Sequence, residues 1–421
     1  MRAFFIAILM LSVSCGRAFN PSQAQAGEDT SASAEPIDHY PLTPLLNDGQ
    51  SVALRMKARQ LAEGLSLKEL CGQVLMVSVD GKTGLSSWGA AFLSEIKPGA
   101  VLLFGFNIPP EAFALRGLSA AIAETAQHKG IRPFIAIDHE GGDVFRIKSG
   151  VTRLPSAKSL GSYGPDLAGL AGALSGAELR ALGVTMNLAP VAEALNARNV
   201  AFLGTRAWSE QPAEAGILAY RFIEGSQGSG TAAAAKHFPG NSDGDPHAAL
   251  PVLELSMEEL SEGFLASFIP ALRAKPAAVM LSHALIPVLD ADKPVSLSHK
   301  AIALLKSDLG FRGIVLSDDL VMAALGDAGG PARAALSALE AGADMLMVSG
   351  AKEARSIRDA LLAALSEGSL DEARLRDAAY RIFLQKTRFA LDEPMPDISA
   401  EDFEALVTGN RAALRRSTTG L

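Results

Sequence analysis

The stretch TAAAAKHFPGNSDGDPH, residues 231–247, begins as an apolar run and ends as a polar loop. The run consists of small residues as far as Ala235 and is followed by Lys236 and His237. The remainder is rich in Gly, Pro, Asn and Ser, which form turns. A short apolar run that ends at turn residues is typical of a fully buried strand. The stretch therefore predicts a buried strand that carries charged side chains to a loop.

Seven further runs share this character, and helix-like stretches rich in Ala and Leu separate them. Near-continuous apolar strands that alternate with helices predict a parallel sheet covered by helices. We expect a protein of the α/β class, with a single (β/α)8 TIM barrel over residues 51–395 and a C-terminal extension over 396–421. An open doubly wound sheet gives a similar pattern, so periodicity alone does not choose between the two. The seven further runs are residues 71–79, 99–104, 133–138, 183–190, 277–283, 313–319 and 343–349.

Charged residues follow several of these runs. DHEGGDVFR (138–146) comes directly after the third run, and SDD (317–319) ends the seventh. Packing alone does not explain charges at the ends of buried strands, because an unpaired buried charge is costly. In a TIM barrel the carboxyl ends of the strands form the face that carries the active site. The pattern therefore predicts a functional site at that face.

The bulk composition excludes several classes of protein. The chain has 421 residues, of which 48% are hydrophobic and 20% charged, so it can bury a large core. Its formal net charge of −8 and its lack of a basic cluster argue against a nucleic-acid partner. Cys15 and Cys71 are the two cysteines, too few for a disulfide framework or a cysteine-based zinc site. We expect Cys71 to be a small core residue and the chain to be a monomer.

The first fifteen residues, MRAFFIAILMLSVSC, resemble a bacterial secretory signal. One basic residue precedes an apolar run that is too short to span a membrane, and small residues precede Cys15. This layout predicts a signal peptide over residues 1–15 with lipoprotein-like cleavage, and membrane attachment through a lipidated Cys15. Ordinary secretion with cleavage nearby is the alternative. Residues 16–50 read as a flexible linker, and we expect a periplasmic or cell-surface location.

Asp318 and Asp319 follow the apolar run directly, so at least one carboxylate should face the mouth of the barrel. A carboxylate there is a candidate nucleophile or metal ligand. Asp is also a favoured N-cap before a helix, which is the simpler structural explanation. We expect one aspartate to serve each purpose.

Asp138, Glu140 and Arg146 lie around the Gly141-Gly142 pair, which permits a tight turn. A tight turn lets several side chains converge on one pocket. Carboxylates beside an arginine suit the binding of sugar hydroxyls, whereas a purely structural salt bridge is the alternative.

The loop that follows His237 carries Asp243, Asp245 and His247. A carboxylate two residues from a histidine can orient the imidazole and raise its basicity, which suits general acid and base catalysis near neutral pH. A metal site built from all three side chains is the rival, although the loop lacks the helical histidine spacing of common zinc sites. A solvated surface loop is the simplest alternative. We expect no metal and no cofactor.

Four motifs in this order, IDHEGGDVFR, NLAPV, KHFPG…DPH and SDDLVM, resemble glycoside hydrolase family 3. The resemblance is to its single-domain β-N-acetylglucosaminidase branch and covers roughly residues 55–390. It implies that Asp318 is the nucleophile and that His247 is the acid/base, with Asp245 as its partner in an Asp-His dyad.

The resemblance also implies a set of sugar-binding residues. Asp138, Arg146, Lys236 and His237 match positions in the motifs, and Arg206 matches the binding arginine in GTRAW (204–208). No cofactor is implied, because a carboxylate meets the charge that develops on the sugar.

This sequence departs from the family pattern at a few positions. Asn241-Ser242 stands where the family commonly has Gly-His, and Pro246 stands where a serine lies between the dyad residues. The loop between His237 and His247 is two residues shorter than usual, GTRAW lacks the acidic residue before the arginine, and Glu193 replaces an aspartate. These changes bear on loop motion and on the preference for the leaving group.

The resemblance implies retaining hydrolysis of terminal β-linked N-acetylglucosamine from cell-wall muropeptides or chitooligosaccharides. Phosphorolysis is the runner-up, because a neutral imidazole repels phosphate less than a carboxylate does. A surface-anchored sugar-binding lipoprotein without catalysis is the second alternative.

Overall fold

The computed structural model describes residues 48–419 and shows a closed barrel of eight parallel strands. The strand order is β1-β10-β9-β8-β7-β6-β3-β2, and each expected apolar run contains one strand. The barrel is therefore confirmed, and the open-sheet alternative is excluded. The strands are Leu75–Ser78 (β1), Ala100–Leu103 (β2), Phe134–Ile137 (β3), Met186–Asn187 (β6), Ala232–Phe238 (β7), Ala278–Leu281 (β8), Ile314–Asp319 (β9) and Met345–Val348 (β10).

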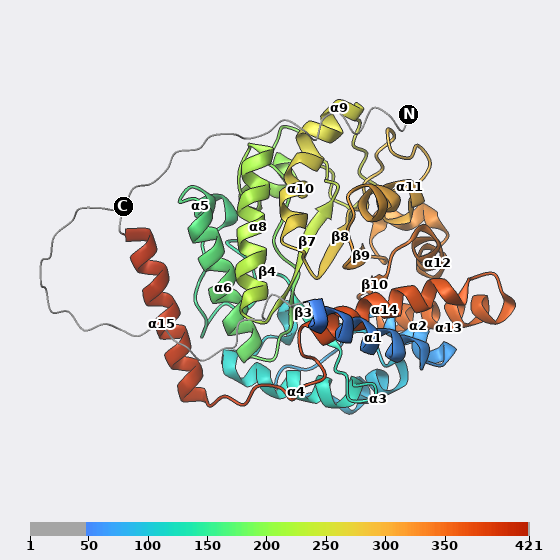
Figure 1. Ribbon diagram of the computed structural model, residues 1–421, viewed down its shortest axis with the longest axis horizontal. Helices are drawn as coiled ribbons and strands as arrows, with labels where there is room; N and C mark the ends of the chain where they lie inside the picture. The colour runs from blue at the N-terminus through green and yellow to red at the C-terminus, as the bar shows by residue number, and fades with distance from the viewer. Residues whose placement is uncertain (1–47, 420–421) are drawn as a thin grey trace, which may run out of the picture. The chain divides into compact units, whose positions relative to one another are not determined.

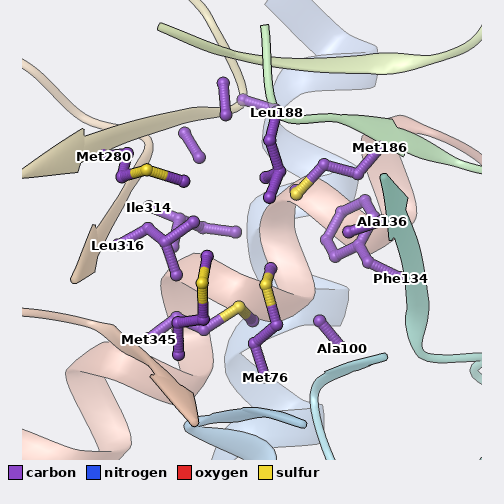
Figure 2. Packing of buried hydrophobic residues seen from close by; sticks show 14 of the residues in the cluster. Met76, Ala100, Phe134, Ala136, Met186, Leu188, Met280, Ile314, Leu316 and Met345 are labelled. Carbon is purple, nitrogen blue, oxygen red and sulfur yellow. The ribbon is translucent and has the colours of Figure 1, made fainter. Parts of the chain in front are cut away.

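The inside of the barrel is packed with apolar side chains. Figure 2 shows Met76, Met186, Met280 and Met345 pointing toward one another from four different strands, with the ring of Phe134 beside them. Methionine is unbranched and fills irregular gaps, which suits the space where side chains from facing strands meet. The packed interior closes the floor of the barrel, so a ligand can enter only from the carboxyl ends of the strands.

Helices surround the barrel, and α6 and α8 lie side by side on one flank (Figure 1). The helices that follow successive strands are Ser87–Ile96 (α3), Leu115–Ala126 (α4), Pro165–Ala181 (α6), Pro212–Gly228 (α8), Ala266–Arg273 (α10), His299–Ala303 (α11), Pro331–Ala341 (α12) and Ala351–Glu367 (α13). The remaining helices are Asp48–Glu63 (α1), Leu67–Gln73 (α2), Ala157–Gly161 (α5), Val200–Leu203 (α7), Met257–Glu259 (α9), Glu372–Arg388 (α14) and Ala400–Thr419 (α15).

Short 3-10 and π-helical segments interrupt the connections. They are Gly105–Asn107 (η1), Ala112–Ala114 (η2), Gly204–Arg206 (η3), Leu260–Leu265 (η4), Val295–Leu297 (η5), Leu304–Asp308 (η6) and Ala323–Ala328 (η7). Between β7 and β8, the helical segments α9, η4 and α10 follow one another without a break.

Helix α15 packs against α6 through a buried polar contact (Figure 1). The Glu178 carboxylate accepts hydrogen bonds from the Asn410 side chain at 2.8 Å and from the Thr152 backbone N–H at 2.8 Å. Because an unbonded buried carboxylate is costly, these donors stabilise the docking of the C-terminal helix.

Several predictions concern residues outside the described range. The signal peptide, the lipidation of Cys15 and most of the linker fall there. Cys71 is fully buried in α2, as expected of a core residue. Within residues 48–419 no helix is both long enough and apolar enough to cross a membrane.

Candidate active site

Charged side chains gather where β3 and β7 end. Asp138 follows β3 and leads into a small hairpin, His139–Gly141 (β4) paired with Val144–Phe145 (β5). Gly141 and Gly142 have φ values of 103° and 55°, which favour glycine, so the expected tight turn is present. The hairpin turns Glu140 toward Lys236, which lies on β7.

Four side chains form an ion-pair cluster, which we define as Asp138, Glu140, Arg206 and Lys236. Glu140 and Lys236 are buried, and Asp138 and Arg206 are 20% and 18% exposed. The Lys236 ammonium lies 2.6 Å from Asp138 Oδ1 and 2.8 Å from Glu140 Oε1. Arg206 donates two parallel hydrogen bonds of 2.9 Å to the Glu140 carboxylate. Bidentate pairing of this kind fixes the direction of both side chains. The cluster is a rigid polar patch above the apolar barrel core.

The cluster holds its members in their charged states. Burial alone would raise the pKa of Glu140, but Lys236 and Arg206 lower it to about 2. Burial likewise opposes the charge of Lys236, yet the carboxylates of Asp138 and Glu140 raise its pKa above the ordinary value. Opposite charges at hydrogen-bond distance favour the ionised forms. The cluster therefore presents fixed charges that can bind sugar hydroxyls.

Arg146 lies at the edge of the cluster. Its guanidinium is 3.9 Å from Asp138 Oδ2 and 38% exposed, and its buried Nε has no hydrogen-bond partner. A buried donor without a partner is rare in folded proteins. Arg146 thus retains hydrogen-bonding capacity that a ligand can use.

His237, the next residue on β7, is held by Glu193, which lies beyond the end of β6. The His237 Nδ1 is 2.8 Å from Glu193 Oε1, and its backbone N–H donates to the same oxygen at 3.1 Å. Asn241 donates to Glu193 as well, through its backbone N–H at 2.6 Å and its side chain at 3.2 Å. The Glu193 side chain is fully buried.

Asp318 and Asp319 end β9, and a register shift against β10 occurs just before Asp319. Such a bulge re-aims side chains next to an active site. Asp319 is buried, and its carboxylate accepts hydrogen bonds from the backbone of Val321 and Ser349, which is a structural use. Burial, assisted by the nearby charge of Asp318, raises the pKa of Asp319.

Asp318 lies in the same neighbourhood as two histidines. Buried His283 follows β8 and bonds to the backbone carbonyl of Asp319 at 3.1 Å and to the Ser296 hydroxyl at 2.7 Å. Burial lowers the pKa of His283, Asp318 opposes that effect, and His237 adds to it. Asp318, His283 and His237 end or follow the adjacent strands β9, β8 and β7, so all three lie at the same face of the barrel.

Residues 240–247 form the segment that we call the dyad loop. The His247 Nδ1 lies 2.8 Å from Asp245 Oδ1, and the His247 backbone N–H donates to the same oxygen at 2.9 Å. These two bonds lower the pKa of Asp245, the backbone bond contributing most. The two side chains are 66% and 58% exposed.

Besides the bonds from Asn241 to Glu193, two further hydrogen bonds attach the dyad loop to its neighbours. Asp243 Oδ1 accepts the backbone N–H of Ala201 in α7 at 2.7 Å. The carbonyl of Pro246 accepts the backbone N–H of Ala324 in η7 at 3.0 Å, and η7 follows Asp318 by a few residues. The loop thus reaches from β7 across to the segment behind the candidate nucleophile.

The structure brings the expected sugar-binding residues together around one network. Asp138, Arg206 and Lys236 are in the ion-pair cluster, Arg146 borders it, and His237 is adjacent on β7. Asp243 turns to α7 and not toward the dyad. No group of three or more His, Cys, Asp or Glu side chains in the described part of the chain is arranged to hold a metal ion.

The sequence predicted no role for Glu193 or His283, whereas Asp319 has the structural use expected of one of the two aspartates. Glu193, His283 and Asp319 each stabilise the groups around the barrel mouth. The runs 183–190 and 277–283 also end near polar residues, so the rule applied to the other strand ends could have identified Glu193 and His283. Glu140 was considered as a sugar-binding residue, but its carboxylate is already paired with Lys236 and Arg206.

The arrangement combines three chemical elements. Fixed buried charges can bind a polar ring, a carboxylate at the end of β9 can attack an electrophilic carbon, and an exposed imidazole with a carboxylate partner can transfer protons. Displacement at a sugar carbon requires these elements together.

Comparisons with known proteins agree with this geometry. Residues 29–384 match the glycosyl hydrolase family 3 N-terminal domain. A β-hexosaminidase of Methylococcus capsulatus is 37% identical over 288 residues, which span 66% of this chain and 83% of that protein. Among solved structures, a family 3 β-N-acetylglucosaminidase from Paenibacillus superposes with a TM-score of 0.79 at 32% identity, covering 84% of this chain and 68% of that one.

A β-N-acetylhexosaminidase from Beutenbergia cavernae superposes with a TM-score of 0.68 at 26% identity. That match covers 77% of this chain and 99% of the other. The sequence match, the barrel and the polar strand ends together lead to one assignment: the chain belongs to glycosyl hydrolase family 3.

Proposed function

We propose that this glycoside hydrolase is a β-hexosaminidase that removes a terminal β-linked N-acetylglucosamine with retention of configuration. The ion-pair cluster carries the proposal, because its paired charges lie where β3 and β7 end, at the same face of the barrel as the end of β9. The relatives from Methylococcus, a β-hexosaminidase, and from Paenibacillus, a β-N-acetylglucosaminidase, support the same assignment.

The first chemical step uses Asp318 and His247. The Asp318 carboxylate attacks the anomeric carbon, while His247 donates a proton to the glycosidic oxygen, so that the C–O bond breaks and the alcohol leaves. The Asp245 carboxylate is hydrogen-bonded to Nδ1 of His247, so Nε2 is the nitrogen that faces the substrate. Asp245 also stabilises the imidazolium from which this proton comes.

The second step releases the sugar. His247, now neutral, takes a proton from a water molecule, and the oxygen of that water attacks the anomeric carbon from the face that the alcohol left. The bond to Asp318 breaks and its electron pair returns to the carboxylate. Two inversions at one carbon give net retention.

The fold limits where the sugar can bind. Apolar side chains fill the inside of the barrel (Figure 2), so a sugar can be bound only at its mouth. We place the terminal sugar on the ion-pair cluster, with the rest of the oligosaccharide extending outward. Cell-wall muropeptides and chitooligosaccharides both present such an end.

A product analysis with defined substrates tests the proposal. The purified protein is incubated with an aryl β-N-acetylglucosaminide and with the matching β-glucoside, and the first anomer released is identified by proton NMR. We expect cleavage of the first substrate and release of the β-anomer. Release of the α-anomer, or equal cleavage of both substrates, would contradict the proposal.

The same assay separates the two alternatives. Repeating it in phosphate buffer tests phosphorolysis, for which N-acetylglucosamine 1-phosphate would be the main product. A protein that binds N-acetylglucosamine by calorimetry but cleaves no aryl glycoside would be a sugar-binding protein. The intact pairing of His247 with Asp245 favours hydrolysis over a purely binding role.

We further propose that the protein is exported, is attached to a membrane through Cys15 and acts there as a monomer. The apolar run followed by small residues and Cys15 supports this location. Incorporation of labelled palmitate by the wild type, and its absence from a Cys15→Ser variant, is the expected result. Equal labelling of the two proteins would overturn lipidation at Cys15, and light scattering of the soluble variant would report its mass.

A further inference from the structure

Glu193 differs from the other carboxylates around the barrel mouth in how its charge is stabilised. Its side chain is 0% exposed, and within residues 48–419 its hydrogen bonds all come from His237 and Asn241. A buried carboxylate is costly unless it is fully hydrogen-bonded. Four donors meet this need, so Glu193 and its two partners form one unit.

The first partner of that unit is a sugar-binding candidate. A carboxylate can only accept, so the contact of 2.8 Å places the proton of His237 on Nδ1. Nε2 is then the nitrogen left to face a ligand. The Phe202 ring, whose centroid lies 6.1 Å from that of the imidazole, packs near the same ring. Glu193 therefore sets both the tautomer and the orientation of His237.

The second partner lies at the start of the dyad loop. Asn241 is 2% exposed, whereas Asp245 and His247 are more than half exposed. The two hydrogen bonds from Asn241 to Glu193 thus fix the point from which the exposed part of the loop departs. A change at that point displaces His247, which lies six residues further along.

We propose that Glu193 is a positioning residue that holds His237 in its sugar-binding orientation and anchors the dyad loop through Asn241. The inference rests on the proposed function, because it assigns both effects to the same hydrolytic site. Glu193 touches no substrate. It links the part of the site that binds the sugar to the part that transfers the proton.

The first test is spectroscopic and needs no turnover. The protein is labelled with ¹⁵N-histidine, and long-range ¹H–¹⁵N correlations report which ring nitrogen of each of the 7 histidines carries the proton. A His237→Gln variant assigns the His237 signal. We expect the Nδ1–H form of His237 in the wild type and a different tautomer population in Glu193→Gln. An Nε2–H form in the wild type would overturn the proposal.

The second test is kinetic and uses a matched control. In Glu193→Gln one acceptor oxygen becomes an NH₂ group that faces a donor, so either His237 or Asn241 loses its bond. We expect kcat/KM for an aryl β-N-acetylglucosaminide to fall about 10- to 100-fold, with KM raised, because small displacements at an active site have effects of this size. Glu178→Gln removes an equally buried carboxylate on α6, far from the site, and should lower the melting temperature while leaving kcat and KM unchanged.

The third test separates the two partners. Asn241→Gly removes the side-chain bond to Glu193 and keeps the backbone bond, so the loop loosens while His237 stays fixed. We expect kcat to fall about 3- to 10-fold with KM and the His237 signal unchanged.

Defined outcomes would overturn the inference. The first is that Glu193→Gln keeps the wild-type kcat/KM and only lowers the melting temperature, as Glu178→Gln does. The second is that Asn241→Gly keeps the wild-type kcat. If Glu193→Gln fails to fold, the wild-type spectrum and the Asn241→Gly kinetics still test whether Glu193 is a positioning residue. If the wild type cleaves no β-N-acetylglucosaminide, the proposed function is wrong. The spectroscopic test still reports the tautomer of His237 in that case.

Discussion

The ion-pair cluster and the dyad loop carry the two halves of the proposed reaction, and they are built in opposite ways. The Lys236 side chain is 3% exposed and bonded to two carboxylates, whereas the His247 side chain is 66% exposed and bonded to one. The two most buried members of the cluster, Glu140 and Lys236, lie on strands, whereas the dyad lies on a loop held by a few hydrogen bonds. Binding is therefore assigned to the rigid part of the molecule and proton transfer to the part that can move.

This difference has an energetic reason. Buried charges are stable only when they are paired, so the cluster must be complete before substrate arrives. Because the dyad loop exposes its side chains, changing its position costs little. Substitutions in the cluster should therefore reduce stability and activity together, whereas substitutions in the dyad should reduce activity alone.

The largest expected effect comes from Lys236→Met. The substitution leaves Asp138 and Glu140 with one cation fewer at 2.6 and 2.8 Å, and breaking a buried ion pair destabilises a protein by roughly 3–5 kcal/mol. We expect a lower free energy of unfolding in urea and loss of measurable glycosidase activity.

Lys306→Met provides the matched control. Lys306 pairs with buried Asp344 at 2.7 Å, near the opposite ends of the strands, and Arg374 also bonds to Asp344. We expect reduced stability with unchanged kcat/KM. If Lys236→Met were as stable as the wild type, the cluster would not be the rigid element described here.

A smaller effect is expected for His247→Ala, and it should be confined to catalysis. Loss of a general acid or base typically lowers the rate about 10²- to 10⁴-fold. Since His247 is largely exposed, the melting temperature should stay within a degree or so of the wild type. The control is His299→Ala, an exposed histidine at the start of α11, which should change neither quantity. A large drop in melting temperature for His247→Ala would remove the contrast between the two regions.

The smallest effect is expected for Asp243→Ala, which releases the dyad loop from α7. The carboxylate acts as a cap for the backbone N–H of Ala201, and loss of such a cap costs about 0.5–2 kcal/mol, with the low end fitting an exposed site. We expect kcat to fall about 2- to 5-fold. Asp243→Asn keeps an acceptor oxygen and should restore most of the activity. Identical kinetics for the alanine variant and the wild type would show that this contact does not position the loop.

The barrel could be predicted from the sequence because buried parallel strands have a characteristic local sequence pattern. Runs such as residues 231–238 and 313–319 are apolar throughout and then turn polar within one or two residues. No local pattern predicts closure of the sheet, because closure depends on the pairing of β1 with β10, which are far apart in the sequence.

The sequence predicts those site residues that lie at the ends of strands. Asp138, Arg146, Lys236 and His237 were identified in this way, and the resemblance added Arg206. The pairing of Glu140 with Arg206 and of His237 with Glu193 joins residues 66 and 44 positions apart, so it depends on how distant segments of the chain meet in the folded protein. The sequence patterns identify the side chains but do not predict these contacts.

If Asp318 is the nucleophile of a two-step reaction, the covalent intermediate can be trapped on it. A 5-fluoro N-acetylglucosaminyl fluoride reacts with a retaining enzyme to form a slowly hydrolysed glycosyl-enzyme, which peptide mass spectrometry can locate. We expect one added sugar, attached to Asp318. No adduct on an active enzyme, or an adduct on Asp319 or another residue, would contradict it.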